Sequence, residues 1–317
     1  MNNRKAFDST TVRRYDGTKA AELSSSGTAV LPYSGTAVPS YSSTAVPSYC
    51  RTVVRFLPET QSAIEAALAA GGLLIRRVGR IRSVRLKTPK DPVTEVDAAA
   101  ERCIHRILRR RFPRIGFLGE EGGAREGPDG RWIVDPLDGT IAFVAGLPLF
   151  SVCIALEREG GLEASVLYLP PLQELFVAER GRGAWLNGRR VHVSGRRTLR
   201  ECVIALWHDD TVWKNRALRE RIAALALRVR NVRIFGAGFA LASVAAGRLD
   251  AYWEQSAHPW DLAAGALLVA EAGGRVTTGV GRPFDLDDPT ILASNGHIHR
   301  RLAAALRPPG RAASWRS

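Results

Sequence analysis

The segment Trp132 to Thr140, WIVDPLDGT, constrains the fold most because it joins an apolar strand to two closely spaced carboxylates. Its first three residues form a β-like run that needs burial, and Asp135 and Asp138 follow at once. Two like charges held near each other by a Pro-containing turn repel, and a bridging cation would relieve that repulsion. The segment therefore predicts a buried strand that ends at a cation site.

Two further acidic clusters stand at expected element boundaries. Glu120 and Glu121 lie between glycines after a short apolar run, and Asp261 opens the apolar helix expected from Leu262 onward. Taken alone, each cluster is explained equally well as a turn, a solvated loop or a helix N-cap. Taken together they supply oxygen ligands without His or Cys, a set that favours Mg²⁺ or Mn²⁺ over zinc.

Gly139 and Thr140 add the remaining parts of a phosphate site. They start the segment after the two aspartates, where free backbone N–H groups can hold a phosphate anion. The Thr140 hydroxyl can hold a water molecule. Carboxylates for metal, N–H groups for phosphate and a hydroxyl for water together outline a phosphatase site.

The pattern along the chain predicts layered α and β structure. Residues 26–49 carry three near-copies of an eight-residue Ser/Thr/Pro unit, so residues 1–55 are expected to form a disordered low-complexity extension. Residues 56–317 are expected to form the catalytic domain, mixed α+β to about residue 195 and alternating α/β afterwards. The periodicity predicts helices at 59–78, at 215–229, 239–247 and 261–273, and one that starts after Asp91-Pro92 and runs to Pro113. It predicts strands at 132–135, 149–157, 164–169, 173–179, 202–207, 232–235, 250–254 and 290–293.

Composition narrows the cellular setting and the partners. The net charge of +14 comes mostly from arginine and favours phosphorylated partners, but basic and aromatic residues are not interleaved as in nucleic-acid-binding proteins. Nucleic acid is therefore not expected as the partner, and a non-catalytic basic nucleic-acid-binding protein is the rival hypothesis. The four cysteines form no C-x-x-C pair, and no long apolar run is present, so we expect a cytoplasmic protein without a membrane span.

The three motifs, in this order, resemble the inositol monophosphatase family of the lithium-sensitive, metal-dependent sugar phosphatases. They are Gly119-Glu120-Glu121, the segment from Trp132 to Thr140, and Trp260-Asp261 with a helix that ends in Glu271-Ala272-Gly273-Gly274. The resemblance spans about residues 58–306. It implies an αβαβα sandwich, usually a homodimer, which hydrolyses a small phosphorylated polyol with two or three Mg²⁺ ions, Mn²⁺ being the alternative. The first candidate substrate is myo-inositol 1-phosphate.

The resemblance also assigns roles to individual residues. Glu120, Asp135 and Thr140 would act in catalysis, with Glu120 and Thr140 orienting the attacking water. Gly139 and Thr140 would bind phosphate, and Glu254 and Asp261 would bind the rest of the substrate. Lys87 and Asp97 resemble outer residues of the site. The implied metal ligands are Glu120, Asp135, the Leu137 carbonyl, Asp138 and Asp261.

Two segments depart from the common pattern of the family. Ile141-Ala142-Phe143 stands where a residue followed by Asn-Phe is usual, and an Ala-Phe ending resembles some bacterial histidinol-phosphate phosphatases. Phe235 to Ala240 is also atypical, and this segment can line the substrate pocket. Histidinol-phosphate phosphatase, 3′(2′),5′-bisphosphate nucleotidase and fructose-1,6-bisphosphatase therefore stay open as alternatives.

Overall fold

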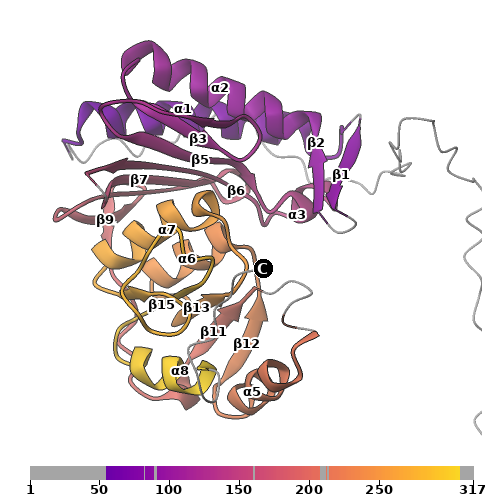
Figure 1. Ribbon diagram of the computed structural model, residues 1–317, viewed down its shortest axis with the longest axis vertical. Helices are drawn as coiled ribbons and strands as arrows, with labels where there is room; N and C mark the ends of the chain where they lie inside the picture. The colour runs from indigo at the N-terminus through magenta and orange to yellow at the C-terminus, as the bar shows by residue number, and fades with distance from the viewer. Residues whose placement is uncertain are drawn as a thin grey trace, which may run out of the picture.

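The structure is a computed structural model that describes residues 55–307, except residues 82, 89–90, 160, 208–211 and 213. Helices and sheets alternate in five layers, with helix pairs outside both sheets and a further pair between them (Figure 1). This arrangement confirms the αβαβα sandwich predicted from the sequence. The disordered extension expected at residues 1–55 lies, apart from Arg55, outside the described residues.

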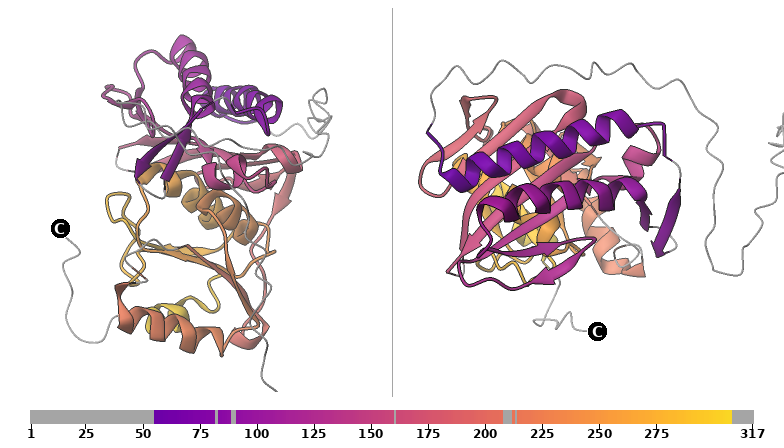
Figure 2. Two further views of the ribbon diagram at one scale, coloured as in Figure 1. Left: turned by 90° about the vertical axis from the view of Figure 1, so that its right-hand side faces the viewer. Right: turned by 90° about the horizontal axis from the view of Figure 1, so that it is seen from above.

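Helices α1 (Pro58–Arg77) and α2 (Glu95–Arg111) form the first layer, as the periodicity predicted. Helix α2 begins with a capping box, in which the Val96 N–H donates to Thr94 Oγ1 and the Thr94 N–H donates to Asp97 Oδ2. One face of each helix is buried against the sheet below. The view from above in Figure 2 shows the two helices lying side by side across that sheet.

Eight strands form the larger sheet in the order β10-β9-β8-β7-β6-β5-β3-β4. Only β3 and β5 run parallel among these neighbours, and the other pairs are antiparallel. The bounds are β3 (Gly116–Gly119), β4 (Gly123–Arg125), β5 (Arg131–Asp138), β6 (Ser151–Arg158), β7 (Gly161–Leu169), β8 (Glu174–Glu179), β9 (Gly183–Leu186) and β10 (Arg189–Val191).

Strand β5 carries the motif that opened the sequence analysis. It pairs with β6 in regular register up to Asp135, and the register then shifts before Asp138 pairs with Ser151. Such a bulge re-aims the side chains of a strand and is common beside active sites. Strands β3 and β5 run parallel, so their carboxyl ends lie at the same end of the sheet. Glu120, which directly follows β3, therefore lies near the end of β5.

Helices α6 (Ala237–Ala245) and α7 (Pro259–Glu271) fill the middle layer. Both are buried on nearly every side, as expected for helices between two sheets. They pack closely, since a Cβ at Gly265 would lie 2.3 Å from a Leu241 methyl carbon. Helix α7 begins two residues before the predicted Asp261, with Pro259 in its first turn, where a missing N–H costs nothing.

The smaller sheet has the order β12-β11-β13-β15-β14, and α5 and α8 cover its outer face. Most of these elements match the predicted ones within a few residues, but the helix predicted at 215–229 ends three residues early. The bounds are β11 (Val203–Leu206), α5 (Arg216–Ala226), β12 (Asn231–Ile234), β13 (Ala251–Glu254), β14 (Arg275–Thr277), β15 (Ile291–Ser294) and α8 (His299–Leu306).

A few short elements complete the fold. The hairpin of β1 (Val84–Thr88) and β2 (Asp91–Thr94) stands beside helix α3 (Thr140–Val144), and single 3₁₀ turns occur at Pro170–Leu172 and Leu199–Glu201. None of these was predicted, because each is too short to show a period. Among the described helices, none is long and apolar enough to cross a membrane.

Candidate active site

Asp135 stands at the centre of a cluster of four carboxylates. Its side chain is 2 % exposed, and its Oδ1 accepts the Leu137 N–H at 2.9 Å. Burial raises the pKa of Asp135 well above its ordinary value, and the negative charges of Glu120, Asp138 and Asp261 raise it further. The structure therefore brings together the side chains of all four predicted carboxylate ligands, which come from β5, from the loop after β3 and from α7.

Asp138 is held by donors from two neighbouring elements. Its Oδ2 accepts the Ser151 hydroxyl from β6 at 2.8 Å and the Gly238 N–H from α6 at 3.1 Å. Burial raises the pKa of Asp138 to about 6, although these hydrogen bonds act in the opposite direction. The atypical segment around Gly238 thus reaches the carboxylate cluster.

Asp261 lies in the first turn of α7. Its Oδ2 accepts the His258 N–H at 2.7 Å, which also caps the helix. Burial raises the pKa of Asp261 well above its ordinary value, with further contributions from Glu254 and the cluster. A helix N-terminus partly offsets a negative charge, so this position is suited to a carboxylate.

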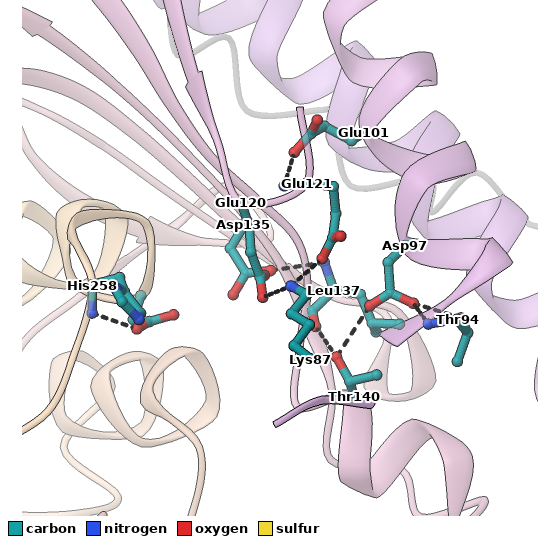
Figure 3. A network of polar contacts seen from close by, with 11 residues as sticks. Lys87, Thr94, Asp97, Glu101, Glu120, Glu121, Asp135, Leu137, Thr140 and His258 are labelled. Carbon is teal, nitrogen blue, oxygen red and sulfur yellow. Dashed lines mark hydrogen bonds and ion pairs between the residues drawn. The ribbon is translucent and has the colours of Figure 1, made fainter. Parts of the chain in front are cut away.

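Glu120 contacts a cation that the chain itself provides. The Lys87 ammonium group, from the β1–β2 hairpin, donates to Glu120 Oε1 at 2.7 Å and also to Glu121 (Figure 3). Partial burial acts to lower the pKa of Lys87, but the two glutamates outweigh it, so the pKa lies above its ordinary value. Glu101 fixes the same loop by accepting the Glu121 N–H at 2.8 Å.

Thr140 joins the cluster to helix α2. Its hydroxyl oxygen lies 3.0 Å from the Leu137 carbonyl oxygen and 3.1 Å from Asp97 Oδ1, and its single hydrogen can serve only one of them at a time (Figure 3). Burial raises the pKa of Asp97 to about 6, against the hydrogen bonds that Thr94 donates. The Leu137 carbonyl is therefore beside the hydroxyl predicted to orient water.

Gly139 has a conformation that other residues rarely adopt. Its φ of 87° is left-handed, and a Cβ there would lie 2.6 Å from the Leu149 carbonyl oxygen. This turn starts helix α3, whose first N–H groups have no acceptor inside the helix. Gly139 and Thr140 thus lie where backbone N–H groups can meet an anion.

Glu254 lies beside this cluster at the end of β13. Its side chain is 3 % exposed, and its Oε2 accepts the Tyr252 hydroxyl at 2.6 Å. Burial and then the charge of Glu254 raise the pKa of Asp261, so the two carboxylates interact electrostatically. Its contact with a substrate stays a prediction.

The carboxylates face protein donors as they stand. Within residues 55–307 as described, no three His, Cys, Asp or Glu side chains form a ready-made metal site. Lys87 holds Glu120, the His258 N–H holds Asp261, and Ser151 with Gly238 holds one oxygen of Asp138. The donor set nevertheless fits a hard divalent cation. The four carboxylates repel one another, Asp135 and Asp138 are buried, and a cation would stabilise their negative charges. A cation at this site would compete with Lys87 for Glu120, whereas Asp261 can keep the His258 N–H on Oδ2 and bind through its other oxygen.

A model of the inositol monophosphatase family matches residues 57–309 of the chain. The chain belongs to the inositol monophosphatase family. It is thus a phosphoric monoester hydrolase, and the predicted enzyme class is confirmed.

Individual relatives of the family agree over most of the chain. The inositol-1-monophosphatase of Mesorhizobium japonicum is 44 % identical over 253 residues, which cover 78 % of this chain and 95 % of that protein. The Nus factor SuhB of Pseudomonas aeruginosa is 42 % identical over 261 residues, covering 79 % and 96 %. The crystal structure of the extragenic suppressor protein suhB from Bartonella henselae matches with a TM-score of 0.75 at 42 % identity, covering 78 % and 98 %. Inositol monophosphatases are generally metal-dependent, in keeping with the carboxylate cluster.

Sequence reasoning missed four polar residues around this inositol monophosphatase site. Glu121 was seen only as part of an acidic run, and Glu101, Ser151 and Tyr252 were not singled out. A lone Ser or Tyr carries no motif, and only strand register and helix packing bring these side chains to the carboxylates. For Glu101 a weak signal existed, since it lies one helical turn after Asp97 on the same face of α2.

Proposed function

We propose that the chain hydrolyses the phosphate monoester of a small polyol, with myo-inositol 1-phosphate as the first candidate and Mg²⁺ as the metal. The observation that carries this proposal is the convergence of Glu120, Asp138 and Asp261 on Asp135, a buried carboxylate. A cluster of this kind has no structural use that an apolar core would not serve better, so it is understandable as a cation site.

Glu120, Asp135, the Leu137 carbonyl, Asp138 and Asp261 would hold two or three cations, and Mn²⁺ would fit the same ligands. Divalent cations bound there supply a water of lowered pKa and positive charge for the phosphate oxygens. No other group of the site needs to form a bond with the substrate.

Thr140 and Glu120 orient the attacking water in this proposal. The Thr140 hydroxyl donates to the Leu137 carbonyl or to Asp97, so its oxygen can accept a hydrogen bond from that water. Glu120 accepts a second hydrogen bond from the water and can take up a proton of the water once Lys87 has moved aside. The water oxygen bonds to phosphorus in line as the bond between phosphorus and the alcohol oxygen breaks. The leaving alkoxide takes up a proton from bulk water, and the products are inorganic phosphate and the free alcohol.

The N–H groups of Gly139 and Thr140 hold the phosphate in place. The left-handed turn at Gly139 starts helix α3, so its first N–H groups are directed away from the helix. Asp261 and Glu254 lie on the opposite elements, α7 and β13, and accept hydrogen bonds from substrate hydroxyls. A polyol is the alcohol that matches two acceptor carboxylates.

The decisive test is release of inorganic phosphate from myo-inositol 1-phosphate with and without Mg²⁺. A panel with histidinol phosphate, fructose 1,6-bisphosphate and 3′-phosphoadenosine 5′-phosphate then separates the alternatives by kcat/KM. Myo-inositol 1-phosphate should give the highest value. A higher value for another ester would move the assignment to that substrate, and Mg²⁺-independent release would contradict the role of the carboxylates.

Three further properties belong to the same proposal. Inhibition by lithium is expected from the family, a homodimer is the expected assembly, and the cytoplasm is the expected location. Lithium titration of the phosphate-release assay tests the first property. Light scattering of the purified protein tests the second, because a monomer of 34.5 kDa and a dimer differ twofold in mass. Cell fractionation tests the third.

A further inference from the structure

The two oxygens of the Asp138 carboxylate are in different environments. Oδ2 accepts two hydrogen bonds, from the Ser151 hydroxyl at 2.8 Å and from the Gly238 N–H at 3.1 Å, and the Ala237 N–H next to it also donates to this carboxylate. A carboxylate oxygen has two lone pairs in its plane, so both are already used. A cation that binds Asp138 without breaking these bonds has to bind through Oδ1.

The two donors come from elements that are distant in sequence. Ser151 opens β6 and pairs with Asp138 across the sheet, after the register shift in β5. Gly238 lies in the first turn of α6, a helix of the middle layer. Both Ser151 and Gly238 are buried. A hydrogen bond to a charged acceptor in such a dry place is stronger than an ordinary one.

Position 238 has no room for a side chain. Its backbone is not left-handed, but a Cβ at this position would lie 2.2 Å from Ser151 Oγ, 2.8 Å from Asp138 Oδ2 and 3.0 Å from Cys153 Sγ. Any other residue would push the Ser151 hydroxyl away from the carboxylate. Ser151 and Gly238 thus form a matched pair, because the hydroxyl of one occupies the space that the other leaves open.

We propose that Ser151 and Gly238 are positioning residues, which lock Oδ2 of Asp138 so that Oδ1 is presented to a divalent cation. The inference rests on the proposed function for the presence of that cation. Ligands that are oriented by outer hydrogen bonds bind metals more tightly, and loss of such a partner typically costs about 10- to 100-fold in affinity.

The alternative is that the hydroxyl only satisfies a buried charge. In that case Ser151→Ala would change stability and leave metal binding as it is. Binding of Mn²⁺ alone, followed by the electron paramagnetic resonance signal of the free ion, separates the two roles without any substrate.

The variant Ser151→Ala should weaken one class of Mn²⁺ sites by about 10-fold. In the phosphate-release assay, the Mg²⁺ concentration for half-maximal rate should rise by a similar factor, and kcat at saturating Mg²⁺ should stay within about threefold of the wild type. The matched control is Ser165→Ala. Ser165 is equally buried and donates to the Ala264 carbonyl at 2.7 Å, so its loss should lower the melting temperature and leave Mn²⁺ affinity unchanged.

A second pair of variants tests the role of the glycine. Gly238→Ala should lower the melting temperature sharply, and Ser151→Ala/Gly238→Ala should recover part of that loss because the clashing Oγ is gone. The double variant should still bind Mn²⁺ weakly. If the double variant is no more stable than Gly238→Ala, the matched pair is refuted.

The outcomes separate this inference from the proposed function. Wild-type Mn²⁺ affinity in Ser151→Ala overturns the positioning role, even if the protein hydrolyses myo-inositol 1-phosphate. A weakened site in Ser151→Ala, in a protein that hydrolyses no phosphate monoester, supports the positioning role and removes the proposed function. A wild type that binds no Mn²⁺ overturns both.

Discussion

The Nζ atom of Lys87 lies 2.7 Å from Oε1 of Glu120, so an ammonium group occupies the place beside a carboxylate that is proposed to bind a metal. Glu121 contacts the same ammonium group. The raised pKa of Lys87 keeps it charged at neutral pH, and it therefore offsets part of the repulsion in the acidic loop. Lys87 and a cation compete for Glu120 in this arrangement.

The variant Lys87→Met should make the protein more dependent on metal. Without Mg²⁺ its melting temperature should fall by a few degrees, because a partly buried ion pair contributes up to about 1 kcal/mol. The rise in melting temperature on adding Mg²⁺ should be larger than in the wild type, since no competing ammonium remains. Differential scanning fluorimetry in chelator and in Mg²⁺ measures both values.

A control for this variant is Arg114→Gln, which breaks the exposed pair with Asp129 far from the cluster. Its response to Mg²⁺ should equal that of the wild type. An equal Mg²⁺ response in Lys87→Met would contradict the competition.

The variant Asp138→Asn should abolish turnover while the fold is kept. The substitution keeps the shape of a side chain that is 8 % exposed and removes one charge from the cluster, so the metal-free protein should not lose stability. Loss of a metal ligand removes several kcal/mol of transition-state stabilisation, which corresponds to roughly 1000-fold in kcat/KM. Phosphate release and circular dichroism are the measurements, and wild-type turnover would refute the metal assignment.

The variant Thr140→Val tests the hydroxyl beside the Leu137 carbonyl and Asp97. It keeps the β-branched shape and should lower kcat by about 100-fold, a usual effect of losing one positioned catalytic hydrogen bond. Thr140→Ser keeps the hydroxyl and serves as the comparison, with kcat within about tenfold of the wild type. Equal kcat values for the two variants would exclude the hydroxyl from catalysis.

His299 should make the fold sensitive to acid. Burial lowers the pKa of His299 to about 4, and its ring nitrogens lie 2.9 Å from the Thr277 and Ser294 hydroxyl oxygens. Between pH 6.5 and about 4, His299 is protonated in the unfolded chain but neutral in the folded chain. The free energy of unfolding therefore has its full value above this range and decreases as the pH falls through it. The loss should reach about 1 to 2 kcal/mol after allowance for solvent screening.

Urea unfolding at pH 7 and pH 4.5 measures this effect. The variant His299→Gln removes the titrating group, so its stability should fall less between the two pH values than that of the wild type. An equal fall in both proteins would exclude His299 as the source of the acid sensitivity.

The sequence predicted the long elements well because each carries a period and an end signal. Helix α2 follows Asp91-Pro92, after which a helix was predicted, and α1 begins at Pro58, one residue before the predicted start at 59. The hairpin that carries Lys87 was missed, since both strands are short, β1 is largely exposed and a register shift interrupts their pairing. A short strand without a buried face shows no alternation of apolar and polar residues.

The site residues, too, could be predicted only where they lie within a sequence motif. Asp135 and Asp138 could be named because both lie within one motif, next to a strand that must be buried. Ser151 could not, because its contact with Asp138 depends on how β5 shifts register against β6. The contact of the segment around Gly238 with the carboxylate of Asp138 could not be predicted from the sequence either.

The place of Asp261 at the start of α7 has a consequence for newly made chains. Three carboxylates belong to the first sheet or its loops, whereas Asp261 arrives with a helix that packs between both sheets. A molecule whose later half has not docked therefore lacks one of the four carboxylates. If Asp261 is a metal ligand, as proposed, we expect such a molecule not to hydrolyse phosphate esters. We therefore expect phosphate release to begin only when folding is complete, and incompletely folded chains to leave phosphorylated metabolites unchanged.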